Sequence, residues 1–133
     1  MRIMVDANII ISAIIFPKSI VAKVFSHLID NYNFVLSKYT IDEIEDVFIE
    51  KFPHHLVEMK EFIRKAPHEF FVLDKIDDKK YPTIRDIDDL PVLANAIESK
   101  VDILLTGDKD FENVSVKKPK IITPRIYIDE YMG

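Results

Sequence analysis

The sequence has 133 residues, of which 48% are hydrophobic and 31% are charged, and its formal net charge at pH 7 is −5. This length and composition fit a single globular domain over residues 1–133 and exclude a disordered or low-complexity chain. The absence of cysteine excludes disulfides and thiolate metal sites, and two glycines are too few for a glycine-rich loop that binds phosphate.

The longest apolar stretch, from Ile9 to Phe16, is far shorter than the ~20 residues that span a bilayer. The N-terminus also lacks the pattern of a secretory signal. We therefore expect a cytoplasmic protein that does not bind a membrane. The negative net charge argues against a nucleic-acid partner that is bound mainly through its phosphates. This argument weakens if several of the carboxylates bind cations.

The spacing of apolar residues predicts strands that alternate with helices along the whole chain. In chain order, the predicted elements are a strand at 2–5, helices at 8–15 and 19–30, a strand at 34–37, helices at 39–52 and 55–65, a strand at 70–73, a charged loop at 74–88, a helix at 90–100, strands at 103–105 and 121–124, and a helix at 124–131. Short, continuously apolar strands separated by helices are typical of a three-layer α/β sandwich. We expect a mostly parallel sheet of four or five strands with helices on both faces.

Acidic residues follow the predicted strands at four points in the chain. Asp6 ends the first strand, and Glu43 lies in the first turn of the helix after the second strand. The remaining acids are Asp88 and Asp89 at the start of the helix from residue 90, and Asp108 and Asp110 after the strand at 103–105. Because ligands of a parallel sheet bind at the carboxyl ends of its strands, we expect these carboxylates to lie together.

Each acid also has a local structural explanation. An Asp at a strand-to-helix junction, such as Asp6 or Asp89, commonly caps the helix, which is worth about 1 kcal/mol. The segment from Thr40 to Glu43 matches a capping box, and Asp108 fits a turn. These explanations account for single positions but not for four acids at one edge of one sheet. Neighbouring carboxylates repel one another and stay ionised most easily around a divalent cation, and oxygen ligands without cysteine favour Mg²⁺ or Mn²⁺ over zinc.

A resemblance to a known family is carried by four blocks, VDANIIISAIIFP, FVLSKYTIDEIEDVF, DIDDLPVLANAIESKVDILLTGDKDF and IITPRIYID. Through these blocks, which span essentially the whole chain, the sequence resembles the PIN-domain nucleases. It is most similar to the short prokaryotic PIN proteins that act as toxins of toxin–antitoxin pairs. The resemblance implies a PIN-like α/β fold and metal-dependent cleavage of RNA. It also implies an antitoxin protein as a partner and a homodimer.

The resemblance further implies a quartet of catalytic acids and a metal site. The catalytic acids are Asp6, Glu43, Asp89 and Asp108. The ligands of one or two Mg²⁺ or Mn²⁺ ions are Asp6, Asp89, Asp108 and Asp110. Asp86 and Asp88 are near alternatives to Asp89, and Asp42, Glu45 and Asp46 crowd the same helix as Glu43. The polar residues that match positions supporting the acids in the family are Asn8, Ser12 and Thr106.

Fewer residues bear on the substrate contacts and on the alternative functions. Lys79, Arg85 and Lys109 lie close in sequence to the acids and are the predicted contacts to RNA phosphates, although a solvated surface explains them as well. A non-catalytic PIN-fold module that binds RNA or protein needs a broken quartet, and this quartet is complete. A phosphorylated receiver domain expects adjacent acids after the first strand, and a haloacid-dehalogenase-type phosphatase expects a second Asp where Asn8 stands.

Overall fold

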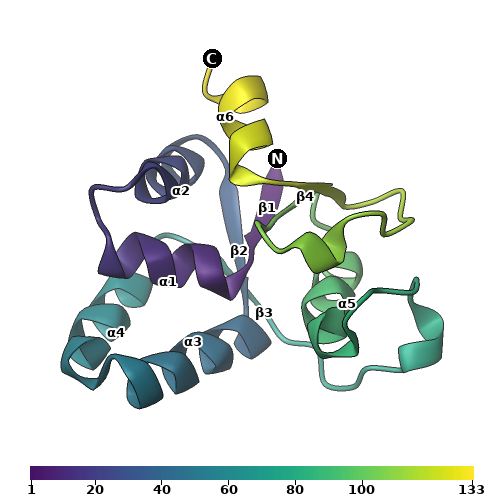
Figure 1. Cartoon of the computed structure of the whole chain (residues 1–133), viewed down its shortest axis with the longest axis horizontal. Coiled ribbons are helices and arrows are strands. Elements are labelled where there is room, and N and C mark those ends of the chain that lie inside the picture. Colours follow the sequence, from purple (N-terminus) through teal and green to yellow (C-terminus); the bar gives the residue numbers. More distant parts are fainter.

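The central strand β1 (Arg2–Val5) lies in a five-stranded sheet with the order β3–β2–β1–β4–β5, and every neighbouring pair is parallel. The sheet is seen in a computed structural model that describes all 133 residues (Figure 1). The other strands are β2 (Asn33–Ser37), β3 (Glu69–Phe71), β4 (Ile103–Leu105) and β5 (Lys120–Ile122). The predicted α/β sandwich with a parallel sheet is therefore confirmed.

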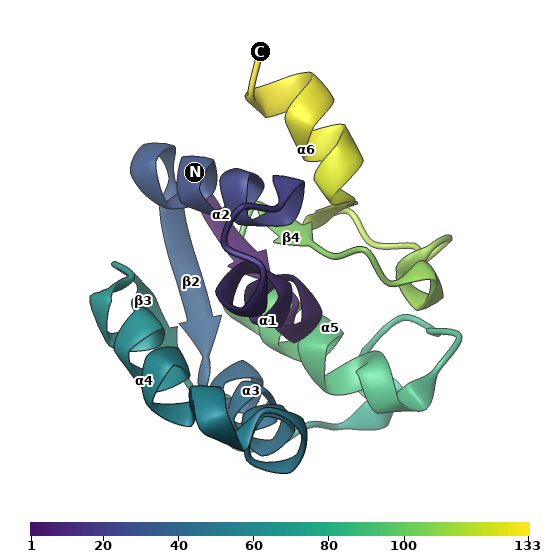
Figure 2. The same ribbon diagram turned by 60° about the vertical axis from the view of Figure 1, so that its left-hand side comes forward.

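Helices cover both faces of this sheet. They are α1 (Ala7–Ile15), α2 (Ile20–Asn31), α3 (Lys38–Lys51), α4 (Leu56–Lys65), α5 (Leu90–Glu98) and α6 (Pro124–Tyr131). No single helix is long and apolar enough to cross a bilayer, and α1 with α2, which together reach such a length, are bent by 110°. Figures 1 and 2 show α1 to α4 on one side of the sheet, α5 on the other, and α6 beside α2.

The two faces follow from the alternation of side chains along each strand. On β1, Ile3 and Val5 belong to a core of twenty buried residues that includes residues of α1, α2, α3 and α4 and Tyr127 of α6. Met4, between them, points to the opposite face and a second core formed with α5 and Phe111. Burial on both faces explains why the strands are continuously apolar.

Several predicted details differ from the structure, among them the strand predicted at 121–124, which is β5 at Lys120–Ile122. The strand predicted at 70–73 is β3 at Glu69–Phe71. The helix predicted from residue 39 begins at Lys38, because Ser37 is its N-cap and the Ser37 Oγ accepts a hydrogen bond of 3.1 Å from the Thr40 amide. Glu43 therefore lies in the second turn of α3, and the capping box predicted for Thr40 to Glu43 is wrong.

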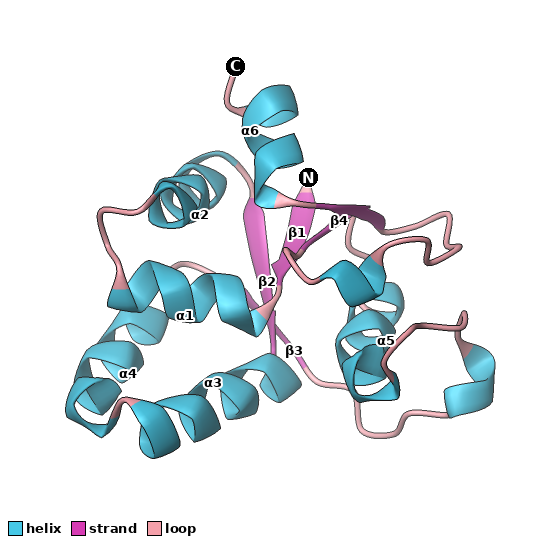
Figure 3. Ribbon diagram, viewed as in Figure 1, coloured by secondary structure: helices cyan, strands magenta, loops and turns pink.

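The two long loops of the fold lie at the same side of the molecule. Figure 3 shows that the segment from β3 to α5 and the segment from β4 to β5 both extend beyond α5. The predicted loop at 74–88 has a short 3-10 turn at Asp78–Lys80, and a second turn at Ile87–Asp89 leads into α5. A third turn, Lys109–Phe111, follows β4. These loops carry the later acids of the sequence.

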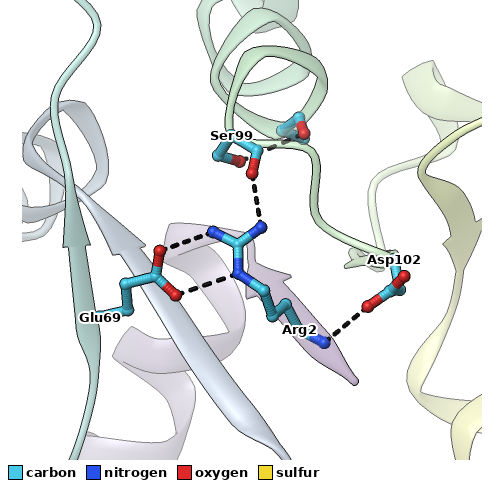
Figure 4. Close-up of polar contacts among 5 residues, drawn as sticks. Arg2, Glu69, Ser99 and Asp102 are labelled. Carbon is cyan, nitrogen blue, oxygen red and sulfur yellow. Dashed lines mark hydrogen bonds and ion pairs between the residues drawn. The ribbon is translucent and has the colours of Figure 1, made fainter.

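Arg2 connects several elements at the opposite, amino-terminal end of the sheet (Figure 4). Its guanidinium donates to both carboxylate oxygens of Glu69 on β3, at 3.0 and 2.7 Å, and to the carbonyl of Ser99 at 2.6 Å. Its backbone amide donates to Asp102, just before β4, at 2.8 Å. This network fixes the ends of β1, β3 and α5 and leaves the carboxyl edge of the sheet free for a site.

Candidate metal centre

Asp6 and Thr106 meet at the carboxyl edge of the sheet. Asp6 directly follows β1, Thr106 directly follows β4, and the register that pairs Val5 with Leu105 places them side by side. The Thr106 hydroxyl donates a hydrogen bond of 2.7 Å to Oδ2 of Asp6 and accepts one of 3.1 Å from the Asp108 amide. Two adjacent strand ends thus bring the first and last acids of the predicted quartet to one place.

The Asp6 carboxylate is buried, with 7% of the residue exposed. Burial raises its pKa above the ordinary value, and the charge of Asp108 raises it further. The Thr106 hydroxyl lowers this pKa in part, as do the backbone amides of Asn8 and Ala7, which lie close without closing a capping hydrogen bond. The helix-cap explanation for Asp6 therefore does not account for its burial.

Glu43 stands beside the same acid from α3. Its Oε1 is buried and has no hydrogen-bond partner. Burial raises the pKa of Glu43, and the charge of Asp6 adds to the shift. A buried carboxylate oxygen without a partner is costly, so its natural complement is a cation or a bound water.

A second group of acids comes from the two long loops. Carboxylate oxygens of Asp86, Asp89 and Asp110 all lie within 4.8 Å of one another. The pKa of Asp89 is raised to about 7 by burial first, then by the charge of Asp108 and by contact with the Asp110 carboxylate. Asp108 raises the pKa of both Asp6 and Asp89, so it lies between the two groups.

The turn and cap explanations apply to some acids and not to others. Asp108 accepts a hydrogen bond of 2.9 Å from the Asp110 amide, and Asp86 accepts one of 3.0 Å from the Asp88 amide, so both stabilise turns. Asp89 accepts no such capping bond from α5. The Asp88 side chain is exposed. Of the three candidates for the third acid, the structure therefore groups Asp89 and Asp86 with Asp110 and leaves Asp88 outside.

Only some of the predicted supporting and basic residues contact the acids. Thr106 contacts Asp6 directly, whereas Asn8 and Ser12 on α1 make no side-chain hydrogen bond to any acid. Arg85 lies 3.8 Å from the Asp110 carboxylate. Lys109 and Lys79 are exposed and form no ion pair.

One residue near the acids is absent from the sequence-based prediction. Tyr39 is one turn before Glu43 on α3. Burial raises the pKa of its phenol, and the charges of Glu43, Asp89 and Asp6 raise it further. Its hydroxyl makes no hydrogen bond within the protein. The spacing of four residues to Glu43 was the available sequence signal, because such residues share a helix face.

The PIN domain family matches residues 2–110, a segment that contains every acid of the two groups. The chain belongs to the PIN domain family. No curated protein matches the sequence significantly. The fold is similar to one chain of the crystal structure of VapBC2 from Rickettsia felis bound to a DNA fragment from their promoter, with a TM-score of 0.69 and 16% identity over 92% of this chain and 98% of that chain.

The donor atoms of this PIN domain fit a divalent cation with oxygen ligands. The ionisable groups that crowd the site are mainly carboxylates, one of which has a buried oxygen without a partner, and the acids raise one another's pKa values. Hard oxygen donors suit Mg²⁺ or Mn²⁺. The residues that could hold such ions are Asp6, Asp89, Asp108 and Asp110, with Asp86 as a further ligand beside Asp89.

Proposed function

We propose that this PIN domain is a metal-dependent endoribonuclease and the toxin of a toxin–antitoxin pair. The single observation that carries the proposal is the crowding of mutually destabilised carboxylates, with the orphan Oε1 of Glu43 among them, at the carboxyl edge of a parallel sheet. A structural helix cap or turn does not need this arrangement. A site that binds a cation and a phosphodiester does.

In such a site, different residues of this chain would bind the metal ions, orient the ligands and hold a proton. Asp6, Asp89, Asp108 and Asp110 would hold one or two ions. When bound, Mg²⁺ or Mn²⁺ supplies charge neutralisation to the phosphodiester and activates water for attack on phosphorus. Thr106 engages one oxygen of Asp6 and leaves the other available as a ligand. Glu43, with its raised pKa and unpaired oxygen, is positioned to hold a proton or orient a water next to Asp6.

Basic side chains near the acids would bind the phosphates of the RNA substrate. Lys109 lies between Asp108 and Asp110 in the chain and is exposed without a partner, so it is free to contact an RNA phosphate. Arg85 forms only a long, exposed ion pair with Asp110 and could exchange it for a phosphate. Lys79 is the third proposed contact, from the loop before α5.

The proposed partners follow from the family and the neighbouring structure. VapBC2 is a complex bound to a promoter DNA fragment, which supports an antitoxin partner for this chain. We also propose that the chain forms a homodimer and acts in the cytoplasm, where its RNA substrate lies. Expression of the wild-type chain alone is expected to arrest growth, and co-expression of a neighbouring antitoxin gene is expected to relieve the arrest.

The test is cleavage of a mixed single-stranded and hairpin RNA with Mg²⁺, Mn²⁺ or EDTA. Wild type is compared with Asp6→Asn and with the matched control Asp46→Asn, because Asp46 is an exposed acid on α3. We expect metal-dependent cutting by wild type and by Asp46→Asn, and loss of at least a hundredfold in Asp6→Asn. A folded wild-type protein that cuts neither RNA with either metal would favour the alternative, a PIN-fold module that binds RNA or protein without cleaving it.

A further inference from the structure

The edge of the sheet formed by β3 and the residues after it has no partner within the chain. β3 is the outermost strand on its side and pairs only with β2 (Figure 2). No backbone-to-backbone hydrogen bond involves residues 72–76, which follow β3. Exposure alternates along this stretch, with Phe70, Val72 and Asp74 exposed and the residues between them half-buried. This period of two indicates that the chain continues in an extended form beyond β3.

The two edges of the sheet differ in how they are protected. Edge strands commonly carry lysine or proline, which discourage pairing with a strand of another molecule. The β5 edge has such protection, from Lys117, Lys118, Pro119 and Lys120. The β3 edge instead presents the continuous apolar sequence FFVL, in which Phe70 is 54% and Val72 is 45% exposed. An uncharged edge with free backbone groups is a template for a further strand.

The sequence of the β3 edge is complementary to itself when two copies run antiparallel. If Val72 of one copy lies opposite Val72 of the other, Glu69 lies opposite Lys75 at both ends of the paired segment. Phe71 then lies opposite Leu73. Apolar pairs and opposite charges at directly facing positions each stabilise an antiparallel pair of strands. A second copy of this chain therefore fits the edge.

The two charged side chains are available for this contact. Lys75 is exposed and forms no ion pair within the chain. Glu69 binds Arg2 through both carboxylate oxygens but is half exposed (Figure 4), and a carboxylate has further acceptor sites for a lysine. A register shifted by one residue places Glu69 opposite Asp74 or Ile76 instead, so the charges favour the register centred on Val72.

We propose that residues 69–75 pair antiparallel with the same segment of a second copy and join the two sheets into one. The inference rests on the proposed homodimer and assigns its interface. A pair of short strands buries less than the about 800 Å² per partner of a standard stable interface, so we expect the dimer to depend on protein concentration. β3 is two strands away from β1, so the pairing does not use the acids of the metal centre.

Cysteine cross-linking tests the register, because the wild-type chain contains no cysteine. In a dimer of Val72→Cys, the two substituted residues would face each other with Cα atoms about 4.5–5.5 Å apart, which is within reach of a disulfide. Asp74→Cys is the matched control on the same exposed segment, because the two copies of that residue would lie roughly 13 Å apart along the strands. We expect oxidised glutathione to cross-link Val72→Cys at least tenfold faster than Asp74→Cys.

Sedimentation equilibrium of the full chain measures the dimer without cysteine chemistry. Lys75→Glu places like charges opposite each other at both ends of the paired segment, so the dimer dissociation constant should rise about tenfold. Lys60→Glu is the matched control, because Lys60 is an exposed residue of α4 that forms no ion pair. It makes the same change of charge and should leave the dissociation constant within twofold of wild type.

The outcomes separate this interface from the proposed function. A dimer that Lys75→Glu does not weaken, and whose two cysteine variants cross-link at equal rates, would overturn the β3 interface and leave the homodimer standing. A chain that stays monomeric at every concentration would overturn both. A monomer in which only a bound antitoxin shields the thiol of Val72→Cys would assign the edge to the antitoxin and overturn the pairing of two copies. RNA cleavage tests the nuclease separately from all three.

Discussion

The Thr106 hydroxyl donates a hydrogen bond of 2.7 Å to the Asp6 carboxylate, and both residues are buried, with 2% and 7% exposed. This bond favours the charged form of Asp6 in a place where burial disfavours it. Because it joins the ends of β1 and β4, it also fixes the direction in which Asp6 can offer its second oxygen. Thr106 is therefore the residue through which the sheet itself positions the metal centre.

Replacement of Thr106 tests this relationship. Thr106→Val keeps the shape and removes the donor, so the pKa of Asp6 should rise further and both metal affinity and cleavage should fall roughly 10–100-fold. Thr106→Ser keeps the donor and should retain most of the activity. Titration of activity against Mn²⁺ is the measurement. Equal losses in the Val and Ser variants would show that packing matters here and the hydrogen bond does not.

We expect Glu43 to lower the stability of the metal-free protein although cleavage requires it. Its Oε1 is buried without a partner and next to the charge of Asp6. Glu43→Gln removes that charge, so thermal melting in EDTA should rise by a few degrees, the effect of about 1 kcal/mol in a domain of this length. Cleavage should fall at least a hundredfold. Glu50→Gln, at an exposed position of the same helix, should change neither quantity.

Much of the fold followed from the sequence because burial on both faces makes each strand a continuous apolar run. The runs around Ile3 and Leu104 identified their strands, and the alternation with helices made the sheet parallel. The weakest prediction was β3, which lies at the sheet edge with Phe70 exposed, so its apolar pattern did not mark its ends. The start of α3 was missed because Ser37, the last residue of β2, is also the helix cap.

Only the acids that directly follow strands could be placed in the candidate site from the sequence. Asp6 and Asp108 follow adjacent strands, so their proximity was predictable. Asp86 was considered only as an alternative to Asp89, because the path of the loop before α5 decides which carboxylates meet, and no periodic pattern encodes that path. The exposed position of Asn8 likewise depends on how α2, α3 and α4 pack against α1.

Arg2 should matter for stability and not for catalysis. Its guanidinium binds Glu69 and the Ser99 carbonyl at the end of the sheet opposite the acids (Figure 4). Because both ionic partners are partly exposed, solvent screening limits the contribution of the ion pair. Arg2→Ala should therefore lower the free energy of unfolding by only about 1–2 kcal/mol, mostly through the hydrogen bonds to the charged guanidinium. Urea denaturation measures this, and cleavage at 25 °C should stay within twofold of wild type.

The stability of the metal-free protein should increase as the pH falls from about 8 to 5.5. Folding raises the pKa of Asp6 and Glu43, and it raises that of Asp89 to about 7. A carboxyl group with a raised pKa binds its proton more readily in the folded state, so it disfavours folding only when it must be charged. The penalty grows as the pH rises through the folded pKa and disappears below the unfolded pKa, near 4 for an aspartate.

Thermal melting in EDTA across this pH range tests the sign. We expect Tm to rise by a few degrees between pH 8 and pH 5.5 in wild type, and to change much less in Asp89→Asn, because Asp89 titrates nearest neutrality. Added Mn²⁺ should reverse the trend, since protons compete with the cation for the same carboxylates and binding weakens as the pH falls. A Tm in EDTA that falls steadily toward pH 5.5 would show that the acids are not crowded enough to oppose folding, and would remove the main physical argument for a cation at this edge of the sheet.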